Sequence, residues 1–85
     1  MATFMNSFTW NQAPNEEFDS LMPLEQENVR KLMAEGKLLH LFVAEDNSGG
    51  WAVHSGETLE EVLALVATMP LRKFMTVNIK QLADM

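Results

Sequence analysis

Residues 38–54, LLHLFVAEDNSGGWAVH, contain two short apolar runs on either side of an acidic, glycine-rich turn. This pattern predicts a β-hairpin with strands over residues 38–44 and 51–55. The first run is apolar almost throughout and has turn signals at both ends, which favours a strand that is buried on both faces. The fold class then depends on what precedes and follows this hairpin.

A helix is predicted before the hairpin. Asn15 is placed to cap its N-terminus, ahead of two glutamates whose charge suits the positive end of a helix. Gly36 is placed to end the helix as a C-terminal cap, and Pro23 predicts either a kink or a fresh helix start. Apolar residues recur at helical spacing between the two caps: Phe18, Leu21, Met22, Val29, Leu32 and Met33.

A second helix and a final strand are predicted after the hairpin. Residues 58–61, TLEE, fit a capping box, and Pro70 ends the helix that follows. Residues 74–82, FMTVNIKQL, alternate as a half-buried strand does, and residues 3–10 also predict a strand. The inner stripe of the second helix contains Leu59, Val62, Leu63, Val66 and Met69.

The resulting order, β-α-β-β-α-β, is that of a ferredoxin-like α+β subunit, and residues 1–85 form a single domain. Right-handed crossovers put both helices on one face of a four-stranded antiparallel sheet. The other face should carry Phe42 and Phe74, and a bare apolar face of this kind is normally an interface. We therefore expect a homodimer or larger homo-oligomer in which two sheets pack face to face.

The composition limits the possible partners. The net charge is −6 and no basic run exceeds two residues, so binding to nucleic acid or to an anionic membrane is not expected. No segment approaches the roughly 20 apolar residues of a membrane span, and the N-terminal residues lack the pattern of a signal peptide. The chain has no cysteine. We expect a cytoplasmic protein whose partner is a small molecule.

The two histidines of the hairpin are predicted to act separately. A turn centred on Ser48-Gly49 puts His54 across from Val43 or Ala44, about 10–13 Å along the ladder from His40. This distance excludes a catalytic pair within one subunit, and His54 is interpreted as a solvent-edge residue. No third ligand has a recognised spacing from either histidine, so no metal site is predicted.

His40 is the more interesting histidine. It alternates with Leu38 and Phe42 and should share their open face, whereas the aliphatic set Leu39, Leu41 and Val43 should face the helices. Inside a dimer its imidazole would be partly desolvated, which lowers the pKa and keeps the ring neutral near pH 7, as a general base requires. The alternative is an interface histidine with no chemistry.

Two further polar residues interrupt apolar patterns. Glu25 lies at the edge of the first helix's apolar stripe, where its carboxylate can reach a pocket; a solvated or salt-bridged carboxylate is the alternative. Asn6 interrupts the apolar alternation of the first strand, and a buried amide needs a structural partner or a ligand.

Two stretches, LMAEGKLLHLF (residues 32–42) and MPLRKFMTVNIKQL (residues 69–82), resemble the muconolactone isomerase family. The resemblance runs without a gap from His40 to Leu82, and Glu25 and Glu27 occupy positions that carry glutamate in the family. Its specific features are the helix end Glu35-Gly36, then His40-Leu41, Pro70-Leu71 and the pair Phe74-Met75.

This resemblance implies a ferredoxin-like subunit that forms a dimeric α/β barrel and works without a cofactor. The namesake enzymes shift a double bond in an unsaturated lactone by moving a proton from one carbon to another. Such a reaction needs one positioned base and groups that stabilise enolate charge. The chain departs from the family at Ser7, where the family enzymes carry a lysine; Lys80 and Arg72 are the candidates to replace that charge.

The leading hypothesis is a cofactor-independent isomerase or cyclase, acting by proton transfer on a small carbonyl- or lactone-containing compound in a cleft between sheet and helices. His40 is the predicted proton-transfer residue and Glu25 its carboxylate helper or second base. The predicted substrate contacts are Asn6, Ser7, Phe42, Trp51 and Phe74. Two alternatives stay open, a non-catalytic dimeric subunit that binds a small molecule or has a structural role, and a cofactor-free monooxygenase.

Overall fold

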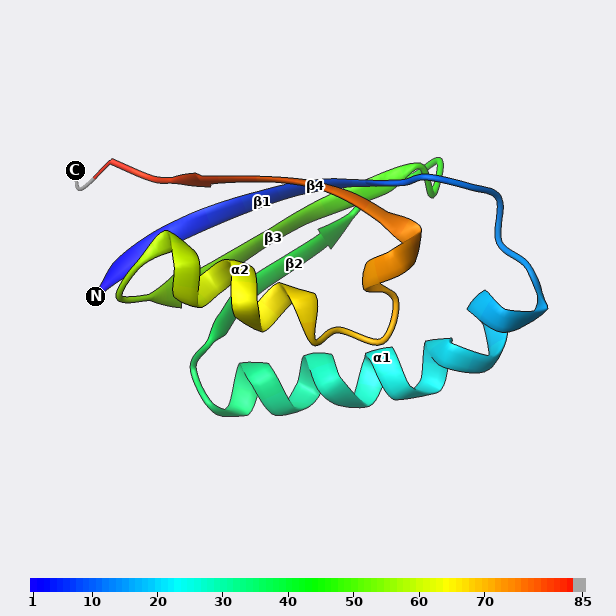
Figure 1. The fold of residues 1–85 in the computed structure, drawn as a ribbon, viewed down its shortest axis with the longest axis horizontal. Helices are drawn as coiled ribbons and strands as arrows, with labels where there is room; N and C mark the ends of the chain where they lie inside the picture. Colours follow the sequence, from blue (N-terminus) through cyan, green and yellow to red (C-terminus); the bar gives the residue numbers. More distant parts are fainter. Residues whose placement is uncertain (84–85) are drawn as a thin grey trace.

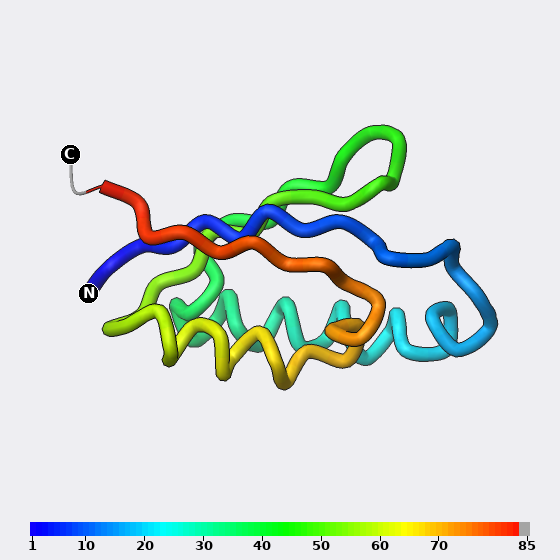
Figure 2. The backbone as a smooth tube through the Cα atoms, turned by 45° about the horizontal axis from the view of Figure 1, so that its top comes forward, coloured from blue at the N-terminus to red at the C-terminus, as the bar shows by residue number. Residues whose placement is uncertain are grey.

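The computed structural model describes residues 1–83, which form one four-stranded antiparallel sheet with two helices on a single face (Figure 1). A second view shows both helices on the same side of the strands (Figure 2). The elements are β1 (Ala2–Trp10), α1 (Glu16–Ala34), β2 (Leu38–Val43), β3 (Gly49–Gly56), α2 (Leu59–Ala67), the 3-10 turn η1 (Arg72–Phe74) and β4 (Met75–Gln81). The strand order β2-β3-β1-β4 confirms the predicted ferredoxin-like α+β fold.

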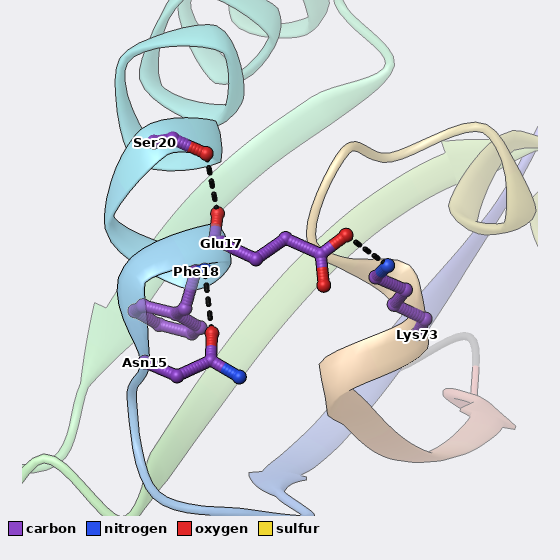
Figure 3. Close-up of polar contacts among 5 residues, drawn as sticks. All are labelled: Asn15, Glu17, Phe18, Ser20 and Lys73. Carbon is purple, nitrogen blue, oxygen red and sulfur yellow. Dashed lines mark hydrogen bonds and ion pairs between the residues drawn. The ribbon is translucent and has the colours of Figure 1, made fainter.

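The helix caps form as the sequence predicts. The Asn15 side chain accepts a hydrogen bond from the Phe18 backbone N–H at 2.9 Å (Figure 3), and the Thr58 hydroxyl accepts one from the Glu61 N–H at 3.2 Å. Gly36 takes the left-handed conformation (φ +75°) that favours glycine at a helix C-terminus. These local signals therefore determine where both helices begin and where α1 ends.

Pro23 does not start a new helix, because α1 continues through it from Glu16 to Ala34. The stripe residues before and after the proline, Phe18 and Leu32, are both buried in the same core. This packing outweighs the backbone hydrogen bond that the proline removes. The N-terminal turn is also tied to η1, since the Glu17 carboxylate pairs with the Lys73 ammonium (Figure 3).

Alternation along β1 divides the sheet into a helix-facing side and an open side. Phe4, Asn6 and Phe8 are buried beneath the helices, whereas Ser7 and Thr9 are exposed on the other side. The register carries this division to the neighbouring strands, because residues paired across a ladder share a face. Asn6, for example, is paired with Ala52 of β3 and with Ile79 of β4.

The prediction that residues 38–44 form a strand buried on both faces is wrong. β2 is an edge strand, and only Leu38 within it is buried. A register shift between Leu38 and His40 adds one residue to β2 relative to β3. This bulge breaks the alternation, so that Leu38 and Leu41 pack against the core while Leu39 is exposed.

The predicted hairpin register is also wrong. Val43 is paired with Gly50 and Leu38 with His54, so the turn is centred between Asp46 and Asn47, two residues earlier than expected. Asn47 adopts a left-handed φ of 60°, which an asparagine tolerates in a tight turn. His54 consequently lies deep in the sheet and not at its solvent edge.

Phe74 does not lie on the open face. It belongs to η1 and is fully buried against Phe18, with ring centroids 5.4 Å apart in an edge-to-face arrangement. Met75, Val77 and Ile79 then face the helices, as the predicted alternation of the last strand requires. The rest of the core comes from the two sheet-facing helix stripes and the loop before η1.

Candidate functional site

A cavity of about 550 Å³ lies between α1 and the helix-facing side of the sheet. Its walls are mostly apolar and come from α1, all four strands and the segment before η1. The polar side chains that line it are few: Asn6, Glu25, Gln26, Arg30 and Asn47. A large apolar cavity with a small number of polar groups is the usual form of a small-molecule site.

Glu25 is the most unusual of these polar residues. Met22 and Val29, one turn before and after it on α1, also line the cavity, so Glu25 lies within the apolar stripe and not at its edge. The residue is only 7% exposed, and neither carboxyl oxygen forms a hydrogen bond of 3.5 Å or shorter within residues 1–83. Burying a carboxylate without a partner is costly, which argues for a role in the cavity.

The surroundings of Glu25 change its acidity. Desolvation raises the pKa of the Glu25 carboxyl above its usual 4.5, and the nearby Leu71 backbone opposes this rise only in part. A carboxyl group with a raised pKa holds and releases a proton closer to neutral pH, as a general acid or base does. The position, burial and acidity of Glu25 therefore all suit proton transfer.

Asn6 lies on β1, on the opposite wall of the cavity from α1. It is 2% exposed, and its Oδ1 atom has no hydrogen-bond donor within the described part of the chain. Its place between Phe4 and Phe8 on the strand turns the amide toward the helices. The prediction that Asn6 is a buried amide is confirmed.

An aromatic row forms one wall of the cavity. The ring centroids of Phe8 and Trp10 are 5.5 Å apart, and those of Trp10 and Phe18 are 5.1 Å apart, both in edge-to-face geometry. All three residues line the cavity. Phe18 lies three residues after Asn15 and donates its backbone N–H to the Asn15 side chain, so the start of α1 positions this part of the wall (Figure 3).

The charged residues proposed to replace the family lysine lie elsewhere. Lys80 is exposed on β4, paired with Met5 on the open side of the sheet, and the Arg72 guanidinium donates to the Met75 carbonyl at 2.9 Å. Neither lines the cavity, but Arg30 does. Arg30 is exposed and forms no ion pair within residues 1–83, so it is the candidate cation for this cavity.

The structure separates the other predicted site residues from this cavity. Ser7, His40, Phe42 and Trp51 lie on the open side of the sheet, where Phe42 is 56% and Trp51 45% exposed. The His40 ring stacks on Phe42 with centroids 5.9 Å apart. Phe74 is packed behind the cavity wall. Of the predicted residues, only Glu25 and Asn6 meet at the cavity, and the roles of the others stay predictions.

His54 differs from its prediction as a solvent-edge residue. It is fully buried between Phe4 and Leu38, and neither ring nitrogen has a partner in residues 1–83. Desolvation lowers its pKa, with the Lys37 backbone acting in the opposite direction. His40 is paired with Val53, one ladder position away, but faces the other side of the sheet. The two rings are therefore not a catalytic pair, although the expected spacing between them was wrong.

Sequence reasoning missed the aromatic wall and Arg30. The walls were assigned to Phe42, Trp51 and Phe74, yet Phe8 and Trp10 share the face of Asn6 by simple alternation. Phe18 likewise shares the α1 stripe with Glu25. These neighbours could have been identified from the residues that share a strand face with Asn6 and a helix face with Glu25.

Among residues 1–83, no group of three or more histidine, aspartate or glutamate side chains is arranged to hold a metal ion. No helix in the same range is long and apolar enough to cross a membrane.

The fold and this cavity define a small ferredoxin-like α+β protein with a candidate small-molecule site between sheet and helix. The sequence matches the muconolactone delta-isomerase family over residues 3–85, and the chain belongs to this family. Membership supports an enzyme of the isomerase type. The resemblance seen in the sequence is thereby confirmed.

Two solved structures show how close the folds are. The structure of muconolactone isomerase superposes with a TM-score of 0.84 at 19% identity, over 98% of this chain and 90% of that chain. A 5-chloro-2-hydroxyhydroquinone dehydrochlorinase from Burkholderia phenoliruptrix AC1100, in complex with 2,5-dihydroxybenzoquinone, superposes with a TM-score of 0.78 at 12% identity, over 95% and 93%. No match was found among curated proteins. At these identities the likeness concerns the fold.

Proposed function

We propose that this protein is a cofactor-independent isomerase that moves a proton between two carbons of a largely apolar carbonyl or lactone compound. The observation that carries the proposal is the Glu25 carboxyl group, which is buried without a partner in the wall of a 550 Å³ apolar cavity. Family membership supports the same class of reaction. Glu25 thus takes the proton-transfer role for which the sequence suggested His40.

The proposed reaction needs only groups at this cavity. Glu25 removes a proton from a carbon next to the carbonyl, and the electron pair of that C–H bond moves into the carbonyl to form an enolate. The Arg30 guanidinium offsets the negative charge on the enolate oxygen. Glu25 then returns the proton to another carbon of the conjugated system, so that a double bond has moved and no atom has been gained or lost.

The homodimer stays part of the proposal. Phe42 and Trp51 form a directly opposed pair on the open side of the sheet, and both remain largely exposed in a single chain. Packing two such faces together would remove this apolar surface from water. Sedimentation equilibrium tests it: a monomer at micromolar concentration would remove the dimer from the proposal, but not the cavity within each chain.

The experiment uses two enolisable compounds, α-angelica lactone and 2-tetralone, in D₂O. NMR measures deuterium incorporation and, for the lactone, the shift of the double bond. Wild-type protein should accelerate exchange above the rate in buffer, and Glu25→Gln should lower the enzymatic rate by about 10²-fold or more. Glu27→Gln, an exposed carboxylate two residues along α1, is the matched control and should keep full activity.

Two outcomes would overturn this assignment. If neither compound exchanges faster with wild-type protein than in buffer, the alternative of a non-catalytic binding subunit is favoured. If exchange survives in Glu25→Gln but is lost in His40→Ala, the proton-transfer residue lies on the open side, as the sequence-based hypothesis stated.

A further inference from the structure

The size of the cavity exceeds the needs of a single-ring substrate. A closed apolar cavity of about 150 Å³ is enough to hold one benzene ring, whereas this cavity measures about 550 Å³. A single-ring lactone would leave most of the volume to water against apolar walls. The cavity opens to solvent on one side, so a compound of two or three fused rings fits within it and covers more of its apolar wall than a single ring does.

The walls suit a flat aromatic compound. The row Phe8, Trp10 and Phe18 presents ring faces and edges along one side, and Met22 and Met75 line the cavity as well. Aromatic rings pack favourably against one another, and thioether sulfur atoms make favourable contacts with ring edges. The cavity also lies between two layers, a sheet and a helix, which favours a planar occupant.

An unpaired hydrogen-bond acceptor in the cavity wall indicates that the ligand carries a hydrogen-bond donor. Asn6 Oδ1 is a buried acceptor with no donor in residues 1–83. Leaving such a group unpaired costs about 1–3 kcal/mol, and a ligand hydroxyl group would supply the missing donor. A site of this kind discriminates strongly against an analogue that lacks the donor.

We propose that the substrate of this cavity is a compound of two or three fused rings, at least one of them aromatic, that carries a hydroxyl group in addition to the carbonyl of the proposed reaction, and that this hydroxyl group donates to Asn6 Oδ1. The inference rests on the proposed function in taking this cavity as the substrate site. It concerns recognition alone, so binding is measured without turnover.

The test compares three probes by isothermal titration calorimetry: 2-naphthol, 2-methoxynaphthalene, which keeps both rings but has no donor, and phenol, which has one ring. Wild-type protein should bind 2-naphthol at least tenfold more tightly than either of the other two. In Asn6→Leu the advantage over 2-methoxynaphthalene should fall to within twofold. Asn78→Leu, an exposed asparagine on the open side of β4, is the matched control and should keep the advantage.

Equal affinity of wild-type protein for 2-naphthol and 2-methoxynaphthalene would overturn the proposal, as would a preference that survives in Asn6→Leu or equally tight binding of phenol. If circular dichroism shows that Asn6→Leu does not fold, nuclear Overhauser effects between 2-naphthol and the wild-type Trp10 and Phe8 rings replace it, and their absence overturns the proposal.

The two proposals fail separately. A lost 2-naphthol preference with intact deuterium exchange would remove this inference and leave the isomerase. A retained preference without exchange would do the reverse.

Discussion

Two buried titratable side chains, Glu25 and His54, differ in one respect that decides their interpretation. Both lack hydrogen-bond partners in residues 1–83. Burial raises the pKa of Glu25 and lowers the pKa of His54, so that it favours the neutral form of each. Glu25 lines a cavity, whereas His54 is enclosed by Phe4 and Leu38 and does not. A shifted pKa therefore marks a candidate for chemistry only where a ligand can reach the group.

The largest expected effect is on the pH dependence of turnover. If Glu25 is the base, kcat/KM for α-angelica lactone should fall as pH drops through the raised pKa of its carboxyl group, by about tenfold per unit below it. His54→Gln should leave the position of this fall unchanged. If substituting His54 shifts the pH profile of kcat/KM and substituting Glu25 does not, His54 and not Glu25 is the group that titrates in turnover.

The next effect is on stability. Glu25→Leu replaces an unpaired buried carboxyl with an apolar side chain of similar size, and should raise the free energy of unfolding by about 1–3 kcal/mol at pH 7.5. Urea unfolding monitored by circular dichroism measures it, with exposed Glu27→Leu as the control. The variant should be inactive, since active sites often sacrifice stability. A destabilised Glu25→Leu would indicate that the carboxyl group has a structural role.

A smaller effect is expected on the pH dependence of folding stability, which has opposite signs for Glu25 and His54. The folded pKa of His54 lies below 6.5, so its contribution to stability is present above pH 6.5 and is lost as pH falls below that value. The folded pKa of Glu25 lies above 4.5, so its contribution is present below pH 4.5 and is lost as pH rises through the folded pKa.

Unfolding at a series of pH values measures this difference. The stability gap between Glu25→Gln and wild type should grow as pH rises above 4.5, and that between His54→Gln and wild type should grow as pH falls below 6.5. Each slope is at most about 1.4 kcal/mol per pH unit. Parallel curves for wild type and a variant would show that the substituted group does not titrate differently on folding.

The smallest effect is expected at the exposed histidine. His40→Ala removes a ring that stacks only on the exposed Phe42, so the free energy of unfolding of the monomer should change by about 0.5 kcal/mol or less. Urea unfolding at low protein concentration tests this. A loss above about 2 kcal/mol would mean that the open side is covered in solution.

The parts of the fold that follow from local chemistry were predictable. Caps at Asn15, Thr58 and Gly36 depend on a few neighbouring atoms, and alternation along β1 and β4 depends on which side chains are apolar. With six elements in this order, the ferredoxin-like topology followed. The family resemblance agreed with it.

The errors arise where long-range packing overrides local pattern. The hairpin turn was centred on its glycines, but the chain turns earlier at Asn47, and this moved His54 from the edge to the interior. The bulge at Leu39 has no sequence signal in an apolar run. Phe74 was assigned to the strand, yet its 3-10 turn directs it into the core. Of the residues that line the candidate site, Glu25 and Asn6 were therefore predicted from the sequence, but their aromatic neighbours were not.

The extra residue in β2 has a consequence for protein engineering. Because Leu39 is the extra residue between the pairs Leu38–His54 and His40–Val53, deleting Leu39 would leave a regular ladder, whereas deleting a paired residue such as Leu41 would move the residues beyond it to the opposite face. A mutant library that assumes regular alternation along β2 would assign the residues on one side of the bulge to the opposite face of the sheet. Deletion scanning, more than substitution, is the sensitive probe of how this edge is held.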